Sequence, residues 1–468
     1  MARGKIAAKV GRAACPHAAE GGVLATKNTK NTKAMKPSGV AWLGDIPDGW
    51  EVDLIGSFYS QRNEKVSDRD YPPLSVTMKG VLPQLATVAK TDDGDNRKLV
   101  KKGDFAINSR SDRRGSCGIS ECDGSVSLIN TILMPRGEME PRYYNWLFHT
   151  DVFSDEFYKW GHGIVDDLWT TRWSEMKRIQ IVRPPLPEQR AIADYLDEKC
   201  GAIDAAIAEA KKGIEEYKVW KKSLIFEAVT GKRRVGIFNA EKQRCGGAEK
   251  MKSSGIPWIG AIPEGWELAR LKNCAKVFGR IGFRGYTTAD IVNEGEGALS
   301  LSPSNLKDIR MDYTKRTYIS WSKYEESPEI KVCKGDIVFV KTGSSYGKAC
   351  IVDDMPCEAT LNPQLVVLKV FSCHNRYLNY YLQTPLIKYQ VELIVSGGTI
   401  PTMSQEKMGG WKIILPPLPE QQAIADYLDE KCAAIDAMVA EKEILIADLE
   451  AYKKSLIYET VTGKREVA

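Results

Sequence analysis

The chain has 468 residues and a net charge of +5, and 43% of its residues are hydrophobic, which predicts more than one domain with an apolar core. It contains no run of eighteen apolar residues, so we expect no transmembrane helix and no membrane partner. Its eleven cysteines form no CxxC pair and accompany only four histidines, which predicts free thiols in a reducing cytoplasm and no bound metal.

The first segment, residues 1–35, is basic, small and polar, with a single acidic residue at Glu20. It lacks the apolar core of a secretory signal. The phrase MKPSG that begins at Met35 returns as MKSSG at Met251. We therefore expect residues 1–35 to be a disordered extension, and translation to begin at Met35.

Two blocks of the chain, residues 36–186 and 252–418, share a common frame. One opens on GVAWLGDIPDGWE and the other on GIPWIGAIPEGWE, and each ends in a β-like run that leads to PPLPEQ. Matching residues are 216 positions apart at these openings but 232 apart at Lys102 and Lys334, so the second block is 16 residues longer in its early part. We expect two similar α/β domains, in which the tryptophans of the openings are core residues: Trp42, Trp50, Trp258 and Trp266.

A long phrase follows each block. PLPEQRAIADYLDEKC begins at Pro185 and PLPEQQAIADYLDEKC at Pro417, and fifteen of the sixteen positions are identical. The identity indicates an internal duplication. Both copies run to VTGKR without an insertion or a deletion, and such a fixed length is typical of a rigid element rather than of a loop.

That rigid element is predicted to be a helix in both copies, over residues 187–231 and 419–463. A proline suits the first helical position, and the glutamate that follows it is favoured by the helix dipole. Gly231 and Gly463 are natural ends. Residues 232–251 between the halves are polar and contain paired glycines, which predicts a linker, and residues 464–468 form a tail.

Each helix carries a narrow apolar seam at alternating spacings of four and three, interrupted by a lysine. Such a seam predicts a coiled-coil partner, and the other copy is the nearest candidate. We expect an α+β protein with two similar α/β domains separated by two long antiparallel helices, related by a pseudo-two-fold axis. The alternative is two unrelated surface helices. The seam residues are Ile203, Ile207, Ile214, Tyr217 and Leu224, and Ile435, Val439, Ile446, Leu449 and Leu456.

Charge is unevenly distributed. The first predicted helix holds 7 basic and 9 acidic side chains and the second holds 4 and 10, a net charge of −8 for the pair. We expect the acidic outer face of the second helix to repel DNA and to be free for protein partners. That face includes Asp426, Asp429, Glu430, Glu441 and Glu443.

Catalytic signatures are weak throughout. The loop from Gly343 to Lys348 resembles a phosphate loop, but it is one residue short and lacks the serine or threonine after the lysine. Asn362-Pro-Gln-Leu departs from the methyltransferase tetrad at two positions, which favours a turn or the start of a strand. Glu329-Ile-Lys has no partner aspartate on a preceding strand. We therefore expect no catalysis by this chain alone.

Two basic stretches remain. Between residues 97 and 114, seven basic side chains face two acids, and a second set accompanies glycines around Phe283. Basic, glycine-rich loops suit a phosphate backbone, and arginine reads guanine in the major groove. The alternative is a solvated charged loop. The candidate DNA contacts are Arg97, Lys98, Lys101, Lys102, Arg110, Arg113 and Arg114 in the first block, and Arg280, Arg284, Lys341, Tyr346 and Lys348 in the second.

The repeated helical phrase and the GWE openings resemble the specificity (S) subunit of type I restriction–modification systems, over about residues 36–466. The resemblance implies that each block is a target recognition domain for one half of a bipartite, asymmetric DNA site. It also implies that the helices set the spacing and dock two methyltransferase (M) subunits, through which restriction (R) subunits join. S-adenosylmethionine, magnesium and ATP would then be bound by the partners and not by this chain. Base contacts vary within this family, so the resemblance assigns none of them.

Two other hypotheses stay open. The chain could be a coiled-coil adaptor whose blocks bind proteins without reading DNA, in which case tight, salt-sensitive DNA binding would be absent. It could also be an enzyme with an unrecognised site, in which case the purified chain would turn over a substrate by itself.

Overall fold

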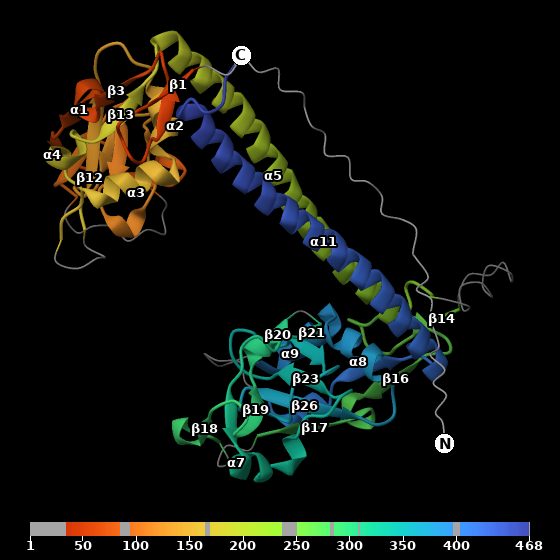
Figure 1. The fold of residues 1–468 in the computed structure, drawn as a ribbon. Helices are drawn as coiled ribbons and strands as arrows, with labels where there is room; N and C mark the ends of the chain where they lie inside the picture. Colours follow the sequence, from red (N-terminus) through yellow and green to blue (C-terminus); the bar gives the residue numbers. More distant parts are fainter. Residues whose placement is uncertain are drawn as a thin grey trace, which may run out of the picture. The chain divides into compact units, whose positions relative to one another are not determined.

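The computed structural model describes residues 34–84, 94–163, 169–235, 250–280, 285–307, 309–395 and 403–467. The chain divides into two compact units (Figure 1). Unit 1 contains the described residues up to Ala202 and those from Ala451 onward, and unit 2 contains Ile203 to Glu450. No helix among the described residues is long and apolar enough to cross a membrane. The predicted extension falls outside the described residues up to residue 33, and so does most of the predicted linker.

Unit 1 is built on a four-stranded antiparallel sheet in the order β10-β9-β12-β4, beside a three-stranded sheet in the order β11-β8-β5. Three two-stranded pairs, β1-β2, β3-β13 and β6-β7, complete it. Its strands are β1 Met35–Pro37, β2 Asp45–Pro47, β3 Glu51–Leu54, β4 Tyr59–Arg62, β5 Lys65–Val66, β6 Leu74–Thr77, β7 Gly80–Pro83, β8 Arg97–Val100, β9 Phe105–Asn108, β10 Cys117–Ile119, β11 Gly124–Val126, β12 Asn130–Pro135 and β13 Gln180–Arg183.

Short helices cover this sheet, and aromatic side chains from the sheet and the helices form the core between them. The rings of Tyr59, Phe105, Phe148 and Phe153 pack with centroids 4.5 to 6.2 Å apart. Edge and tilted ring contacts of this kind favour one fixed arrangement of the core. The helices are α1 Ile55–Phe58, the 3-10 turn η1 Ser111–Arg113, α2 Pro141–Phe148, α3 Asp151–Lys159, α4 Trp173–Met176 and the start of α5 Leu186–Val229.

Unit 2 repeats the frame. Its four-stranded sheet has the order β17-β26-β23-β24, which matches β4-β12-β9-β10, and β16-β27 matches β3-β13. Its strands are β14 Met251–Ser253, β15 Ala261–Pro263, β16 Glu267–Arg270, β17 Ala275–Gly279, β18 Ile291–Val292, β19 Gly297–Leu301, β20 Leu306–Lys307, β21 Arg310–Met311, β22 Tyr318–Ser320, β23 Ile337–Val340, β24 Ala349–Ile351, β25 Ala359–Leu361, β26 Leu365–Val370 and β27 Lys412–Leu415.

The two units differ in their second sheet, which in unit 2 has the order β18-β22-β19-β25 and includes the parallel pair β19-β25. This difference falls where the second block is longer. The helical segments of unit 2 are η3 Leu271–Asn273, η5 Thr288–Asp290, η6 Pro303–Asn305, α7 Trp321–Glu325, η7 Pro328–Ile330, α8 Asn375–Leu382, α9 Pro385–Val395, α10 Gln405–Gly409 and most of α11 Leu418–Val461.

Helices α5 and α11 are the two long elements, each of 44 residues, and they lie side by side in opposite directions (Figure 1). Within unit 2, the Lys221 ammonium lies 2.6 Å from the Asp436 carboxylate, and Lys211 lies 3.7 Å from Glu450. The paired positions rise in one helix as they fall in the other, so the pair is antiparallel, as predicted. The ten seam residues are all buried or half-buried.

Both long helices begin one residue before, and end two residues before, the predicted limits. The early end has a local cause, because Gly231 adopts a φ of 75° and Gly463 a φ of 74°, a conformation that ends a helix. The division into units also cuts across the helices, since each unit contains the start of one helix and the end of the other. The predicted limits of the two recognition blocks stay predictions.

Candidate nucleic-acid interface

One hairpin loop occurs at the same place in both units and carries many of the candidate DNA contacts. In unit 1 it joins β9 to β10 and is closed by a hydrogen bond from the Asn108 amide to the Ser116 carbonyl, at 2.8 Å. In unit 2 it joins β23 to β24 and is closed by Val340 and Lys348 at 2.9 Å, both 232 positions further on. Half of the candidate DNA contacts therefore lie on one matched loop: Arg110, Arg113 and Arg114 in unit 1, and Lys341, Tyr346 and Lys348 in unit 2.

The loop of unit 1 is held firmly at its base. The Tyr158 hydroxyl donates to the carbonyl oxygens of Asn108 and Arg113, each at 3.4 Å. The Arg114 guanidinium lies 5.3 Å from the centre of the Tyr158 ring and 2.8 Å from the Asp155 carboxylate. Arg114 is thus partly engaged within unit 1, and it fixes the loop against α3.

Arg113 is the most accessible cation of this loop. Its side chain is 69% exposed, and its guanidinium lies 3.9 Å from the Asp112 carboxylate. Arg110 is less accessible, at 34%, and lies at the same distance from Asp112. A rigid loop that presents a loosely paired arginine can meet a phosphate or a base edge without being reordered.

The rest of the basic stretch does not join this loop. Arg97 is 5% exposed, and its guanidinium donates to the hydroxyl and the carbonyl of Ser125. Lys98 is half-buried and donates to the Asn130 carbonyl at 2.7 Å, and burial lowers the pKa of its ammonium group. Both residues stabilise the β8 region, so we leave them out of the proposed interface.

Lys101 and Lys102 are exposed, but they lie at the opposite end of β9 from the loop. Four strand residues separate the two ends by about 13 Å. The stretch of positive charge in the sequence therefore divides into two separate surfaces in unit 1.

The loop of unit 2 has a different chemistry. Lys341 is half-buried, and desolvation lowers the pKa of its ammonium group, while Lys348 is exposed and Tyr346 half-buried. Gly343 and Gly347 adopt φ values of 98° and 88°, which permit the tight path of the loop. The two loops share a frame but present different side chains.

One further candidate of the second block, Arg280, does not reach this surface. Arg280 is 3% exposed and donates to the Leu361 carbonyl at 3.0 Å and to the Thr360 hydroxyl at 3.2 Å. We therefore assign it a structural role at the edge of the sheet. Arg284 and the neighbouring Phe283 lie outside the described residues.

The Asn362 segment, whose sequence favours a turn or the start of a strand, has a structural explanation. The Asn362 carboxamide oxygen accepts from the Gln364 amide at 3.0 Å, a turn that leads into β26, which confirms the predicted turn. The described residues contain no group of three or more potential metal ligands.

Sequence reasoning missed how the repeated phrase holds its own domain. The indole of Trp50 donates to the Glu188 carboxylate at 2.9 Å in unit 1, and Trp266 donates to Glu420 at 3.0 Å in unit 2. From the sequence alone, these glutamates are explained only by the helix dipole. The signal was present, because both openings contain GWE and both helices begin with PLPEQ.

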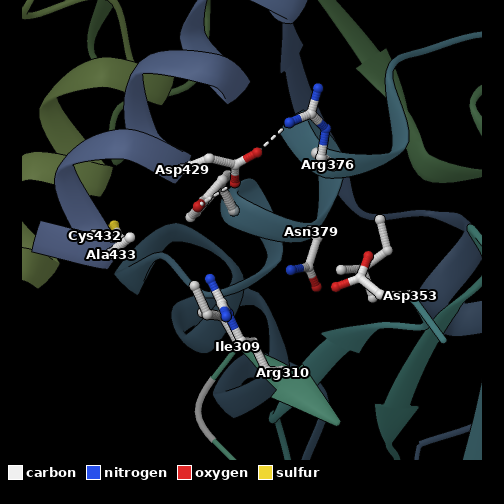
Figure 2. Close-up of a pocket in the computed structure, with 10 residues that line it drawn as sticks. Ile309, Arg310, Asp353, Arg376, Asn379, Asp429, Cys432 and Ala433 are labelled. Carbon is white, nitrogen blue, oxygen red and sulfur yellow. Dashed lines mark hydrogen bonds and ion pairs between the residues drawn. The ribbon is translucent and has the colours of Figure 1, made fainter. Parts of the chain in front are cut away.

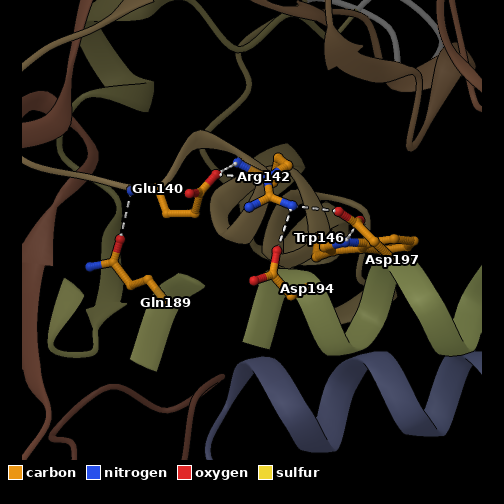
Figure 3. Close-up of polar contacts among 6 residues, drawn as sticks. All are labelled: Glu140, Arg142, Trp146, Gln189, Asp194 and Asp197. Atoms are coloured by element: carbon orange, nitrogen blue, oxygen red, sulfur yellow. Dashed lines mark hydrogen bonds and ion pairs between the residues drawn. The ribbon is translucent and has the colours of Figure 1, made fainter. Parts of the chain in front are cut away.

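The glutamine of the same phrase makes a second junction in each unit. In unit 1, Gln189 accepts from the Glu140 amide at 3.0 Å and donates to the Pro184 carbonyl at 2.8 Å (Figure 3). In unit 2, Gln421 accepts from the His374 amide and donates to the Pro416 carbonyl, both at 2.8 Å. Each glutamine therefore joins the start of a long helix to the start of the helix that covers the sheet.

The prediction that Asp426 and Asp429 are free for partners was wrong. The Arg376 guanidinium binds both carboxylates, and the Tyr380 hydroxyl donates to Asp429 at 2.7 Å. In unit 1, Arg142 binds Asp194 and Asp197 at 2.8 and 2.9 Å (Figure 3). The acids of the repeated phrase thus bind arginines of their own unit. In the sequence these acids only alternate with apolar positions, and that pattern does not predict an arginine partner.

Comparison with known proteins finds one matching family model and relatives that are similar over most of the chain. Residues 263–445 match the family model of the type I restriction modification DNA specificity domain. The putative type I restriction enzyme MjaX specificity subunit of Methanocaldococcus jannaschii is 27% identical over 449 residues, which cover 91% of this chain and 96% of the relative. The MjaVIII specificity subunit of the same organism is 24% identical over 90% of this chain and 94% of the relative.

A solved chain from a study of complex assembly and conformational transition of the type I restriction–modification system has a similar fold. Its TM-score is 0.66 at 14% identity, and the match covers 90% of this chain and 99% of that chain. At this identity the likeness concerns the fold alone.

Proposed function

Because the chain belongs to the specificity-subunit family of type I restriction–modification systems, we propose that it is the DNA-reading subunit of such a complex. Each unit reads one half of a bipartite site. The long helices set the separation of the half-sites and dock two methyltransferase subunits. Restriction subunits join through the methyltransferase subunits.

The observation that carries this proposal is the matched pair of hairpin loops. Both are closed by hydrogen bonds at equivalent positions, and their side chains differ. A repeated scaffold with unlike loops suits the recognition of two unlike half-sites, and hence of an asymmetric target. A coiled-coil adaptor that binds only proteins has no need for exposed arginine on a braced loop.

We further propose that the chain catalyses no reaction itself. S-adenosylmethionine, magnesium and ATP are then bound by the partner subunits. The support is the chemistry of the chain's own motifs, since the Asn362 segment and the Gly343 loop are used for turns. Purified chain that methylated or cleaved DNA alone would contradict this part of the proposal.

The function is tested by footprinting the full chain on its target DNA, which methylome sequencing of the host supplies. We expect two short protected patches with an unprotected gap between them, and an affinity that falls steeply as salt rises. A single continuous patch would contradict the bipartite reading. Binding that does not change with salt would favour the adaptor.

Replacing Arg113 by alanine is expected to weaken binding to one half-site only. The lost contact should reduce the slope of log affinity against log salt by about one. Lys159→Ala is the matched control, because Lys159 is 67% exposed in the same unit and lies on α3 rather than on the loop. Titration of DNA in which one half-site is scrambled separates the two halves. Equal losses for both variants would remove Arg113 from the interface.

A further inference from the structure

A polar cavity of about 270 Å³ lies in unit 2, where α8 meets α11 (Figure 2). Its polar lining includes Arg310, Asp353, Arg376, Asn379 and Asp429. Arg310 comes from β21, Asp353 follows β24, and the others come from the two helices. Four separate segments of the unit therefore contribute polar groups to one small volume.

Asn379 is the unusual member of this lining. The residue is only 3% exposed, and its carboxamide oxygen has no hydrogen-bond partner. A buried acceptor without a partner costs about 1–3 kcal/mol, so native proteins rarely retain one without a use. Neither Arg310 nor Asp353 makes a side-chain hydrogen bond or ion pair within the described part of the chain, so these groups also stay available.

Unit 1 has an amide and an acid at the equivalent positions, although its acid, Glu121, is exposed. Asn145, which matches Asn379, also has a buried carboxamide oxygen without a partner. Glu121 occupies the position of Asp353, since each lies two residues beyond its strand, and α2 packs on β10 as α8 packs on β24. The two blocks differ at most positions, so the retention of both an amide and an acid suggests a shared use.

The charges around each site favour a positively charged partner group that donates hydrogen bonds. Arg376 is already bound by two carboxylates, Asp426 and Asp429, which leaves one net negative charge beside the cavity. In unit 1, Arg142 is bound by Glu140 as well as by Asp194 and Asp197. The groups left available are mainly oxygens, so the missing partner must supply N–H groups and positive charge.

We propose that Asn379 with Asp353, and Asn145 with Glu121, are two sockets, each of which receives an arginine side chain from a partner protein that binds this chain twice. A guanidinium is planar and carries five donors, so it can meet an amide oxygen and a carboxylate together. This inference rests on the proposed function, under which the partner is the methyltransferase subunit. Arg310 has no assigned equivalent in unit 1. In unit 2 it could donate a hydrogen bond to a backbone carbonyl of the partner segment that carries the arginine.

The test titrates the purified methyltransferase subunit of the same system into the full chain by calorimetry. In the double variant Asp353→Asn, Asn379→Leu, we expect one copy to bind as before and the other to bind at least about tenfold more weakly. Adding Glu121→Gln and Asn145→Leu should weaken both copies. Asp354→Asn is the matched control, because it removes the same charge one residue away and that side chain is 89% exposed.

A second measurement separates this role from a structural one. Asn379→Leu alone removes an unsatisfied buried oxygen, so it should keep or raise the thermal stability of the free chain while weakening the partner. Unchanged binding of two copies by the double variant overturns the sockets. Free L-arginine that stabilises the wild type but not the double variant, with partner binding unchanged, overturns the protein partner in favour of a small ligand.

The same samples distinguish the two proposals. If the double variant still binds two methyltransferase subunits and keeps its two-patch footprint, the sockets are wrong and the proposed function stands. If the wild type binds neither the methyltransferase subunit nor DNA, the proposed function fails, and the sockets fail with it.

Discussion

Gly231→Ala is expected to lower the free energy of unfolding by about 2–5 kcal/mol. The new Cβ would lie 2.4 Å from Pro263 Cγ and 3.2 Å from the Trp266 ring, and the residue has a φ of 75°. An L side chain in this conformation costs about 1–2 kcal/mol, and overpacking adds about 1–3 kcal/mol. Urea unfolding followed by tryptophan fluorescence measures the loss, because Trp266 is at the contact.

Gly255→Ala provides the matched control. Gly255 has a φ of 71°, but a Cβ there would meet no atom within 4 Å. Only the conformational cost should remain, about 1–2 kcal/mol. If both variants lower the free energy of unfolding equally, the close contact between the end of α5 and the opening of the second block does not contribute to stability. Gly463 makes the equivalent contact with Pro47 and Trp50 in unit 1 and should behave like Gly231.

A heptad inserted into both α5 and α11 is expected to abolish binding to the native target and to create binding to a target with a longer gap. Seven residues add about 10.5 Å to a helix, which corresponds to about three base pairs. A heptad keeps the apolar seam in register, so the helices should still pair. A library of targets with fixed half-sites and variable gaps gives the preferred length directly.

The control for this experiment inserts seven residues between positions 236 and 249, outside the long helices. The preferred gap should then stay as in the wild type. If the helix insertion leaves the preferred gap unchanged, or if it alters the half-site sequences, the helices do not set the spacing.

Much of the architecture could be predicted from the sequence because the sequence contains an internal duplication. The seam of Ile203, Ile207 and their partners has a strict spacing, and only a helix pair buries it. The repeated frame of the two blocks likewise appears as one sheet order in both units. Duplication makes the shared positions visible, and those positions belong to the scaffold.

The candidate site was less predictable, because a charged residue in a sequence does not show its burial. Arg97 and Arg280 lie in glycine-rich or basic stretches, yet each is turned inward to satisfy carbonyl and hydroxyl oxygens. Such pairings depend on residues 28 and 81 positions away. By contrast, Arg113 lies on a loop that its own strands close, so its exposure is predictable from the local sequence. Its contact with DNA stays a prediction.

The exchange of helix ends between the units has a consequence for synthesis. Unit 1 needs residues from 451 onward, and the Tyr143 hydroxyl donates to the Val461 carbonyl at 2.7 Å. Unit 2, by contrast, ends at Glu450. During translation, unit 1 is therefore synthesised first but completed last. Its contact surface for residues from 451 onward stays uncovered until those residues have left the ribosome.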